Sequence, residues 1–70
     1  MTQKGRVEYL NEKKGYGFIK VDGHEKNLFF HAKDCRMIRF EQLRVSDTVL
    51  IGSIKENEQG KIACDITLVN

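Results

Sequence analysis

Residues 13–21 read KKGYGFIKV, and this stretch alternates as a β-strand does. In a strand, side chains two residues apart point to the same face of the sheet. Tyr16, Phe18 and Lys20 therefore share one face, while the other face carries a glycine and two β-branched residues. The second face is typical of a core, so the stretch predicts two aromatic rings on a solvent-facing surface.

The next apolar stretch, residues 27–32, repeats this arrangement. Leu28 and Phe30 share one face, and Phe29 shares the other with His31, whose polarity favours the outside. Asp22-Gly23 is a strong turn signal that would join the two strands in a hairpin. The hairpin would bring four rings into one patch: Tyr16, Phe18, Phe29 and His31.

An exposed patch of this kind needs an explanation in so small a chain. Burying a phenylalanine contributes about 1.5–3 kcal/mol, and exposed apolar patches usually mark interaction sites. Lysines border the predicted rings, and flat rings with nearby cations suit unpaired bases and their phosphates. The alternative is structural, since cross-strand ring pairs also stabilise sheets. Four rings on one face favour the binding of bases over a purely structural role. The lysines that border the rings are Lys13, Lys14, Lys20 and Lys33.

Outside the hairpin the pattern predicts three more strands, over residues 5–11, 48–56 and 61–69, with a helical turn and a long loop over residues 33–46. In the last strand Ile62, Cys64, Ile66 and Leu68 would face the core. We expect an all-β fold, a five-stranded antiparallel Greek-key barrel of the OB type. An SH3-like barrel fits the strand count almost as well.

The chain of 70 residues carries 12 Lys and Arg against 10 Asp and Glu, a net charge of +2. One domain over residues 1–70 is expected, with a core too thin for a deep active site. Nothing resembles a signal peptide or a membrane span, which predicts a cytoplasmic protein. Cys35 and Cys64 are then reduced, small apolar fillers, because the spacing of cysteines and histidines does not suit zinc. No serine–histidine motif or carboxylate pair indicates an enzyme.

Two motifs carry a family resemblance. KGYGFI at residues 14–19 resembles the first ribonucleoprotein motif of bacterial cold-shock proteins, usually KGFGFI, and LFFH at residues 28–31 resembles their second motif, VFVH. The likeness extends over essentially the whole chain. It implies an OB-type barrel that binds single-stranded RNA or DNA with little sequence preference, as an RNA chaperone or a regulator of gene expression. No cofactor, metal, catalysis, membrane contact or small-molecule substrate is expected, and the expected state is a monomer.

The resemblance also assigns roles to single residues. The four rings match the stacking residues, and Lys14 matches a lysine that reaches nucleic acid. Asn27 stands where the family has a base-binding aspartate, and Phe40 where a loop ring closes over the bases. The alternative for Phe40 is that it plugs the barrel end. With Lys20 from the strand pattern, the predicted contacts are Tyr9, Lys14, Tyr16, Phe18, Lys20, Asn27, Phe29, His31 and Phe40.

Some positions depart from the family pattern. Tyr9 replaces a tryptophan, Glu8 replaces a lysine, and Ala32 replaces a ring after the histidine, so weaker binding than in a typical member is expected. Strand parity places Val7 and Tyr9 on one face, so a bulge is needed if only Val7 is buried. The same barrel could instead use its ring face to dock a protein, which the modest charge and Glu8 slightly favour.

Overall fold

The structure is a computed structural model that describes residues 3–35 and 39–69. Every predicted strand is present, and no end of the strands predicted over residues 5–11, 15–21, 27–32, 48–56 and 61–69 moves by more than two residues. Two short 3-10 helices lie in the long connection, of which residues 36–38 fall outside the described residues. The elements are β1 (Gln3–Asn11), β2 (Tyr16–Val21), β3 (Leu28–His31), η1 (Ala32–Asp34), η2 (Phe40–Gln42), β4 (Thr48–Asn57) and β5 (Gly60–Leu68).

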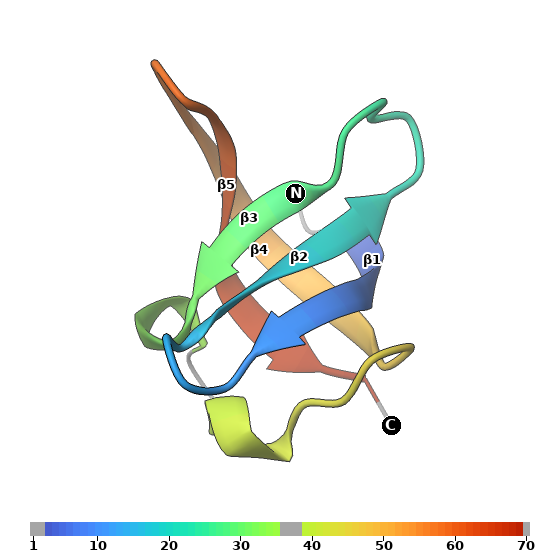
Figure 1. Cartoon of the computed structure of the whole chain (residues 1–70). Coiled ribbons are helices and arrows are strands. Elements are labelled where there is room, and N and C mark those ends of the chain that lie inside the picture. Colours follow the sequence, from blue (N-terminus) through green and yellow to red (C-terminus); the bar gives the residue numbers. More distant parts are fainter. Residues whose placement is uncertain (1–2, 36–38, 70) are drawn as a thin grey trace.

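The strands close into a barrel in the order β1-β2-β3-β5-β4 (Figure 1). Neighbouring strands are antiparallel except β3 and β5, which pair in parallel. This closure is that of an OB-type Greek-key barrel, not the alternative SH3-like barrel. The fold class predicted from the sequence is confirmed.

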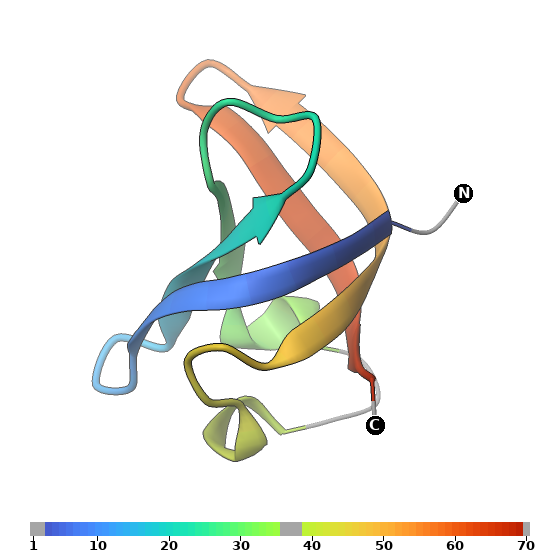
Figure 2. The same cartoon turned by 90° about the vertical axis from the view of Figure 1, so that its right-hand side faces the viewer.

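The two ends of the barrel carry different connections. The β2–β3 loop and the β4–β5 hairpin lie at one end in both views (Figures 1 and 2). The β1–β2 turn and both 3-10 helices lie toward the opposite end. The outer face of β1, β2 and β3 is left uncovered between these ends, and this face carries the predicted rings.

The barrel interior is filled by side chains from all five strands and from the long connection. The predicted inward residues Ile19, Leu28 and Phe30 are fully or almost fully buried. Such burial of apolar area is the main contribution to stability. The core consists of Val7, Ile19, Val21, Leu28, Phe30, Phe40, Leu43, Val49, Ile51, Ala63 and Ile66.

Phe40 is therefore a core residue, and its assignment as a base-binding ring is corrected. Only 6% of Phe40 is exposed, and its ring centroid lies 5.8 Å from that of Phe30. Helix η2 holds it there, because the Leu43 N–H donates to the Phe40 carbonyl at 3.0 Å. A side chain enclosed in this way has no free face for a base. The alternative role, closing the barrel end, is the one that the structure supports.

The bulge expected in β1 is present. Val7 pairs with Ile19 and Tyr9 with Phe18, so Glu8 is an extra residue on β1. An extra residue reverses the side-chain alternation of a strand. Val7 consequently lies in the core with no exposed surface, while Tyr9 is 45% exposed on the outside.

The simple alternation predicted for β5 is wrong in its first half. The alternation places Ala63 on the outer face, yet Ala63 is fully buried. Ile62, which the alternation places in the core, is only half-buried. Asp65 has a φ of 55°, a left-handed conformation, and the alternation of buried and exposed side chains breaks between Ala63 and Ile66. Gly52 permits this conformation, since a Cβ there would lie 2.8 Å from the Cβ of Asp65.

Both cysteines are free thiols that fill space, as predicted. Cys64 is buried, and Cys35 packs against the edge of the core. Burial, followed by the nearby Asp34 and Glu41 carboxylates, raises the pKa of Cys35 from 9.0 to about 11. Burial also raises the pKa of Cys64.

These pKa shifts predict slow thiol chemistry in the native protein. The thiolate is the nucleophile, so a rise from 9.0 to about 11 lowers its population near pH 8 about 100-fold. Alkylation of Cys35 by iodoacetamide should therefore be about 100-fold slower in the native protein than in urea, as peptide mass mapping would measure. Because the pKa of Cys35 is higher in the native state than in the unfolded state, the protonated thiol stabilises the native state below pH 9. This stabilisation is lost as the pH rises from 9 toward 11. Equal rates in both states would contradict the shift.

Candidate nucleic-acid interface

The β2–β3 hairpin sets the positions of the four predicted rings. In its register Tyr16 lies opposite His31, and Phe18 lies opposite Phe29. All four are half-buried, whereas the alternate residues on both strands are buried. The hairpin therefore presents the rings together on the outside of the barrel, as the alternation predicts.

A fifth ring joins them from β1. The bulge places Tyr9 opposite Phe18, with ring centroids 6.0 Å apart. Phe18 is central, because its ring also lies 6.0 Å from that of Tyr16 and 5.9 Å from that of Phe29. We call this surface the ring patch; it consists of Tyr9, Tyr16, Phe18, Phe29 and His31.

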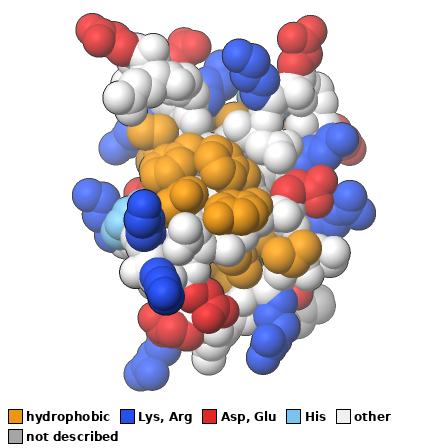
Figure 3. Space-filling view, in the orientation of Figure 1, with side chains coloured by type: hydrophobic (Ala, Val, Ile, Leu, Met, Phe, Trp, Pro, Cys, Tyr) orange, Lys and Arg blue, Asp and Glu red, His pale blue; other side chains and the backbone are white. Residues whose placement is uncertain are grey.

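The ring patch is the main apolar feature of this face (Figure 3). Tyr16 and Phe29 stack at 5.6 Å with 27° between their planes, whereas Phe18 meets both of them edge-on. The rings thus cover part of one another, so they are less exposed than isolated rings on a strand. Basic and acidic side chains lie around the margins of the patch (Figure 3).

Gly17 has its explanation inside the barrel and not beside the rings. A Cβ at this position would clash with the carbonyl oxygen of Tyr9 and lie 2.8 Å from the Phe30 ring. The glycine lets β1 and β2 approach each other closely over the core. This approach brings Tyr9 next to Phe18.

The β1–β2 turn fixes the position of Lys14. Its N–H donates to Asn11 Oδ1 at 3.0 Å, and the Gly15 N–H donates to the Asn11 carbonyl at 2.8 Å. Gly15 supplies the positive φ of 71° that this turn requires. Lys14 is exposed, two residues before Tyr16, at one end of the ring patch.

His31 is oriented by the start of η1. Its Nδ1 accepts a hydrogen bond from the Lys33 N–H at 3.3 Å, and its own backbone N–H donates to Asp34 Oδ2 at 2.9 Å. With Nδ1 acting as an acceptor, the ring proton is on Nε2, which can donate to a ligand. The imidazole therefore offers both a flat face and a hydrogen-bond donor.

The sequence of this chain matches a known protein family. The profile of the "'Cold-shock' DNA-binding domain" matches residues 3–69, which is most of the chain. The chain belongs to the cold-shock domain family. Members of this family are nucleic-acid-binding proteins and not enzymes, and nucleic-acid binding in general is the function that membership supports.

Several individual cold-shock proteins are similar to this domain. The cold shock-like protein CspA of Vibrio cholerae is 32% identical over 69 residues, which cover 96% of this chain and 97% of that protein. The cold shock-like protein CspC of Escherichia coli is 30% identical over 66 residues, 94% of each chain. The cold shock protein CapA of Pseudomonas fragi is 38% identical over 47 residues, 67% of this chain and 73% of that protein.

The charges around the ring patch of this cold-shock domain are mixed. Lys20 follows Phe18 on the outward face of β2, is exposed and pairs across strands with Arg6. Arg6 Nε lies 3.7 Å from Glu8 Oε2, so the acid that replaces a family lysine is partly neutralised. Surface pairs of this kind contribute little to stability, and here the pair moderates negative charge beside Tyr9.

The predicted residues other than Phe40 occupy one side of the domain. Asn27 lies at the far end of the β2–β3 loop, exposed, and lines a cleft that begins at Phe29.

Within the described ranges, no three His, Cys, Asp or Glu side chains gather as a metal site would require. The same ranges hold no helix with the length and apolarity needed to cross a membrane.

Proposed function

We propose that this cold-shock domain binds single-stranded RNA or DNA with little sequence preference. The observation that carries the proposal is five neighbouring rings on the outer face of β1, β2 and β3, bordered by exposed lysines such as Lys14 and Lys20. Bases would stack on the rings, and ammonium groups would contact the phosphates. Stacking on aromatic side chains contributes about 1–3 kcal/mol per base, and every base has a face that can stack.

Bound bases would be unavailable for pairing, which supports a role as an RNA chaperone that keeps transcripts unpaired and so regulates gene expression. Duplexes keep their bases stacked inside and cannot offer them to the ring patch. Residues proposed to contact the strand are Tyr9, Lys14, Tyr16, Phe18, Lys20, Asn27, Phe29 and His31. We propose that residues 1–70 act as one domain and as a monomer.

Binding should depend on salt, but only moderately. On single strands log K falls with log salt by about 0.7 for each phosphate contact. Two to four contacts by the bordering lysines predict a slope of about −1.4 to −2.8. Titrations of an unstructured oligonucleotide at several salt concentrations measure this slope. A slope near zero would contradict phosphate contacts and favour the alternative, a surface that docks proteins.

A further inference from the structure

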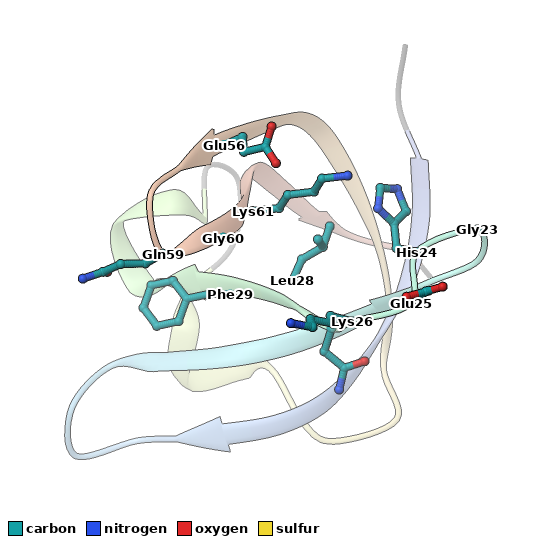
Figure 4. A pocket seen from close by; sticks show the side chains of 11 residues that line it. Gly23, His24, Glu25, Lys26, Leu28, Phe29, Glu56, Gln59, Gly60 and Lys61 are labelled. Atoms are coloured by element: carbon teal, nitrogen blue, oxygen red, sulfur yellow. The ribbon is translucent and has the colours of Figure 1, made fainter.

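A cleft of about 530 Å³ lies between the β2–β3 loop and the β4–β5 hairpin (Figure 4). Pockets of about 300–1,000 Å³ hold small organic ligands, so this volume suits one nucleotide. The side chains that matter for its chemistry are His24, Lys26, Phe29, Glu56 and Lys61.

The cleft is a consequence of how the barrel closes. Strand β3 has four residues and pairs with β5 at a single position, Phe29 with Ile62. Strands β4 and β5, in contrast, stay paired out to Asn57 and Gly60. The β4–β5 hairpin therefore extends beyond the first residue of β3. The β2–β3 loop, which precedes β3, forms the facing wall of the cleft.

The cleft is continuous with the ring patch because Phe29 belongs to both. A smaller hollow of about 250 Å³, also lined by Phe29 and Lys61, adjoins it along the hairpin. A strand that lies on the rings and passes Phe29 would reach this space next.

The lining offers partners for the base and the phosphate of a nucleotide. Phe29 provides an apolar wall, while Lys26 on the loop and Lys61 on the hairpin bring ammonium groups from opposite sides. Glu56 lies opposite Lys61 across the hairpin, and Glu25 also lines the cleft. Carboxylates accept hydrogen bonds from the exocyclic amino groups of bases, and they make the site unsuited to a run of phosphates.

We propose that this cleft is a subsite for one further nucleotide of the strand bound on the ring patch. The inference rests on the proposed function. Lys26 and Lys61 contact the phosphate of this nucleotide, its base lies against Phe29, and Glu56 favours a base with an amino group. Adenine, cytosine and guanine carry such a group, whereas thymine and uracil do not.

The test compares oligo-dA strands of three to nine nucleotides on three proteins: the wild type, the cleft variant K26A/K61A, and the control K4A/K55A. Both variants remove two exposed lysines, and Lys4 and Lys55 do not line the cleft. Dissociation constants are measured by quenching of tyrosine fluorescence. The cleft variant should match the control on the shortest strands, stop gaining affinity one nucleotide earlier, and bind the longest strands about five-fold more weakly.

Two outcomes would overturn this subsite. Either the cleft variant binds like the control at every length, or it is weaker by the same factor at every length, which would indicate general attraction only. In both cases wild-type binding to the ring patch would stand. Absence of binding by all three proteins would instead overturn the proposed function, and the subsite with it.

Discussion

Replacing Phe18 with alanine should weaken the binding of a short unstructured oligonucleotide by about 5- to 150-fold. This range corresponds to about 1–3 kcal/mol for one stacked base. The reason is position: Phe18 contacts Tyr9, Tyr16 and Phe29, so its loss removes the centre of the ring patch. Phe29→Ala should have an effect of similar size, and fluorescence titration measures both. Because the two rings touch, the effects of a double variant should not add.

The matched control for these variants is Leu50→Ala. Leu50 is a half-buried apolar residue on β4, on the other side of the barrel, where it pairs with Lys4 and Thr67. Its truncation should leave affinity unchanged, and circular dichroism checks that each variant folds. If folded Phe18→Ala and Phe29→Ala proteins bind as tightly as the control, the ring patch is not the binding surface.

Replacing Phe40 with alanine should cost about 3–5 kcal/mol of unfolding free energy, because it leaves a cavity beneath the barrel end. A small domain is only marginally stable, so this variant is expected to be largely unfolded at 37 °C. The milder Phe40→Leu removes fewer buried atoms, so it should cost about 1–2 kcal/mol and remain folded. Urea denaturation measures both values.

Phe40→Leu also separates the two roles considered for this ring. A core residue affects stability only, so the folded variant should bind oligonucleotides as the wild type does. A base-stacking residue would lose at least about five-fold in affinity with little change in stability. The second result would contradict the burial of Phe40 against Phe30.

The strand alternation in residues 13–21 and 27–32 predicted most of the candidate site. In each stretch one face contains a polar residue, Lys20 or His31, which identifies that face as the outer one. The rings on the same face are therefore predicted to point outward. The position of Tyr9 was also accessible, since burying Val7 while exposing Tyr9 requires a bulge, and the bulge at Glu8 is present. When a strand has one buried face, its local periodicity is sufficient to predict which side chains point outward.

Other features depend on contacts that periodicity does not describe. Phe40 lies in a connection without a period, and only the closed barrel places it against Phe30. The left-handed conformation of Asp65 depends on the absence of a Cβ at Gly52 on the neighbouring strand. The cleft with Lys26 and Lys61 arises from unequal strand lengths on two hairpins. Each of these follows from tertiary packing between segments distant in sequence.

The most direct test of base stacking on the ring patch uses the protein's own fluorescence. The chain has two tyrosines and no tryptophan, and both tyrosines, Tyr9 and Tyr16, belong to the ring patch. Titration with a single-stranded oligonucleotide should quench this fluorescence to saturation, while a matched duplex at the same concentrations should leave it almost unchanged. Equal quenching by the duplex, or no quenching by the single strand, would contradict the account.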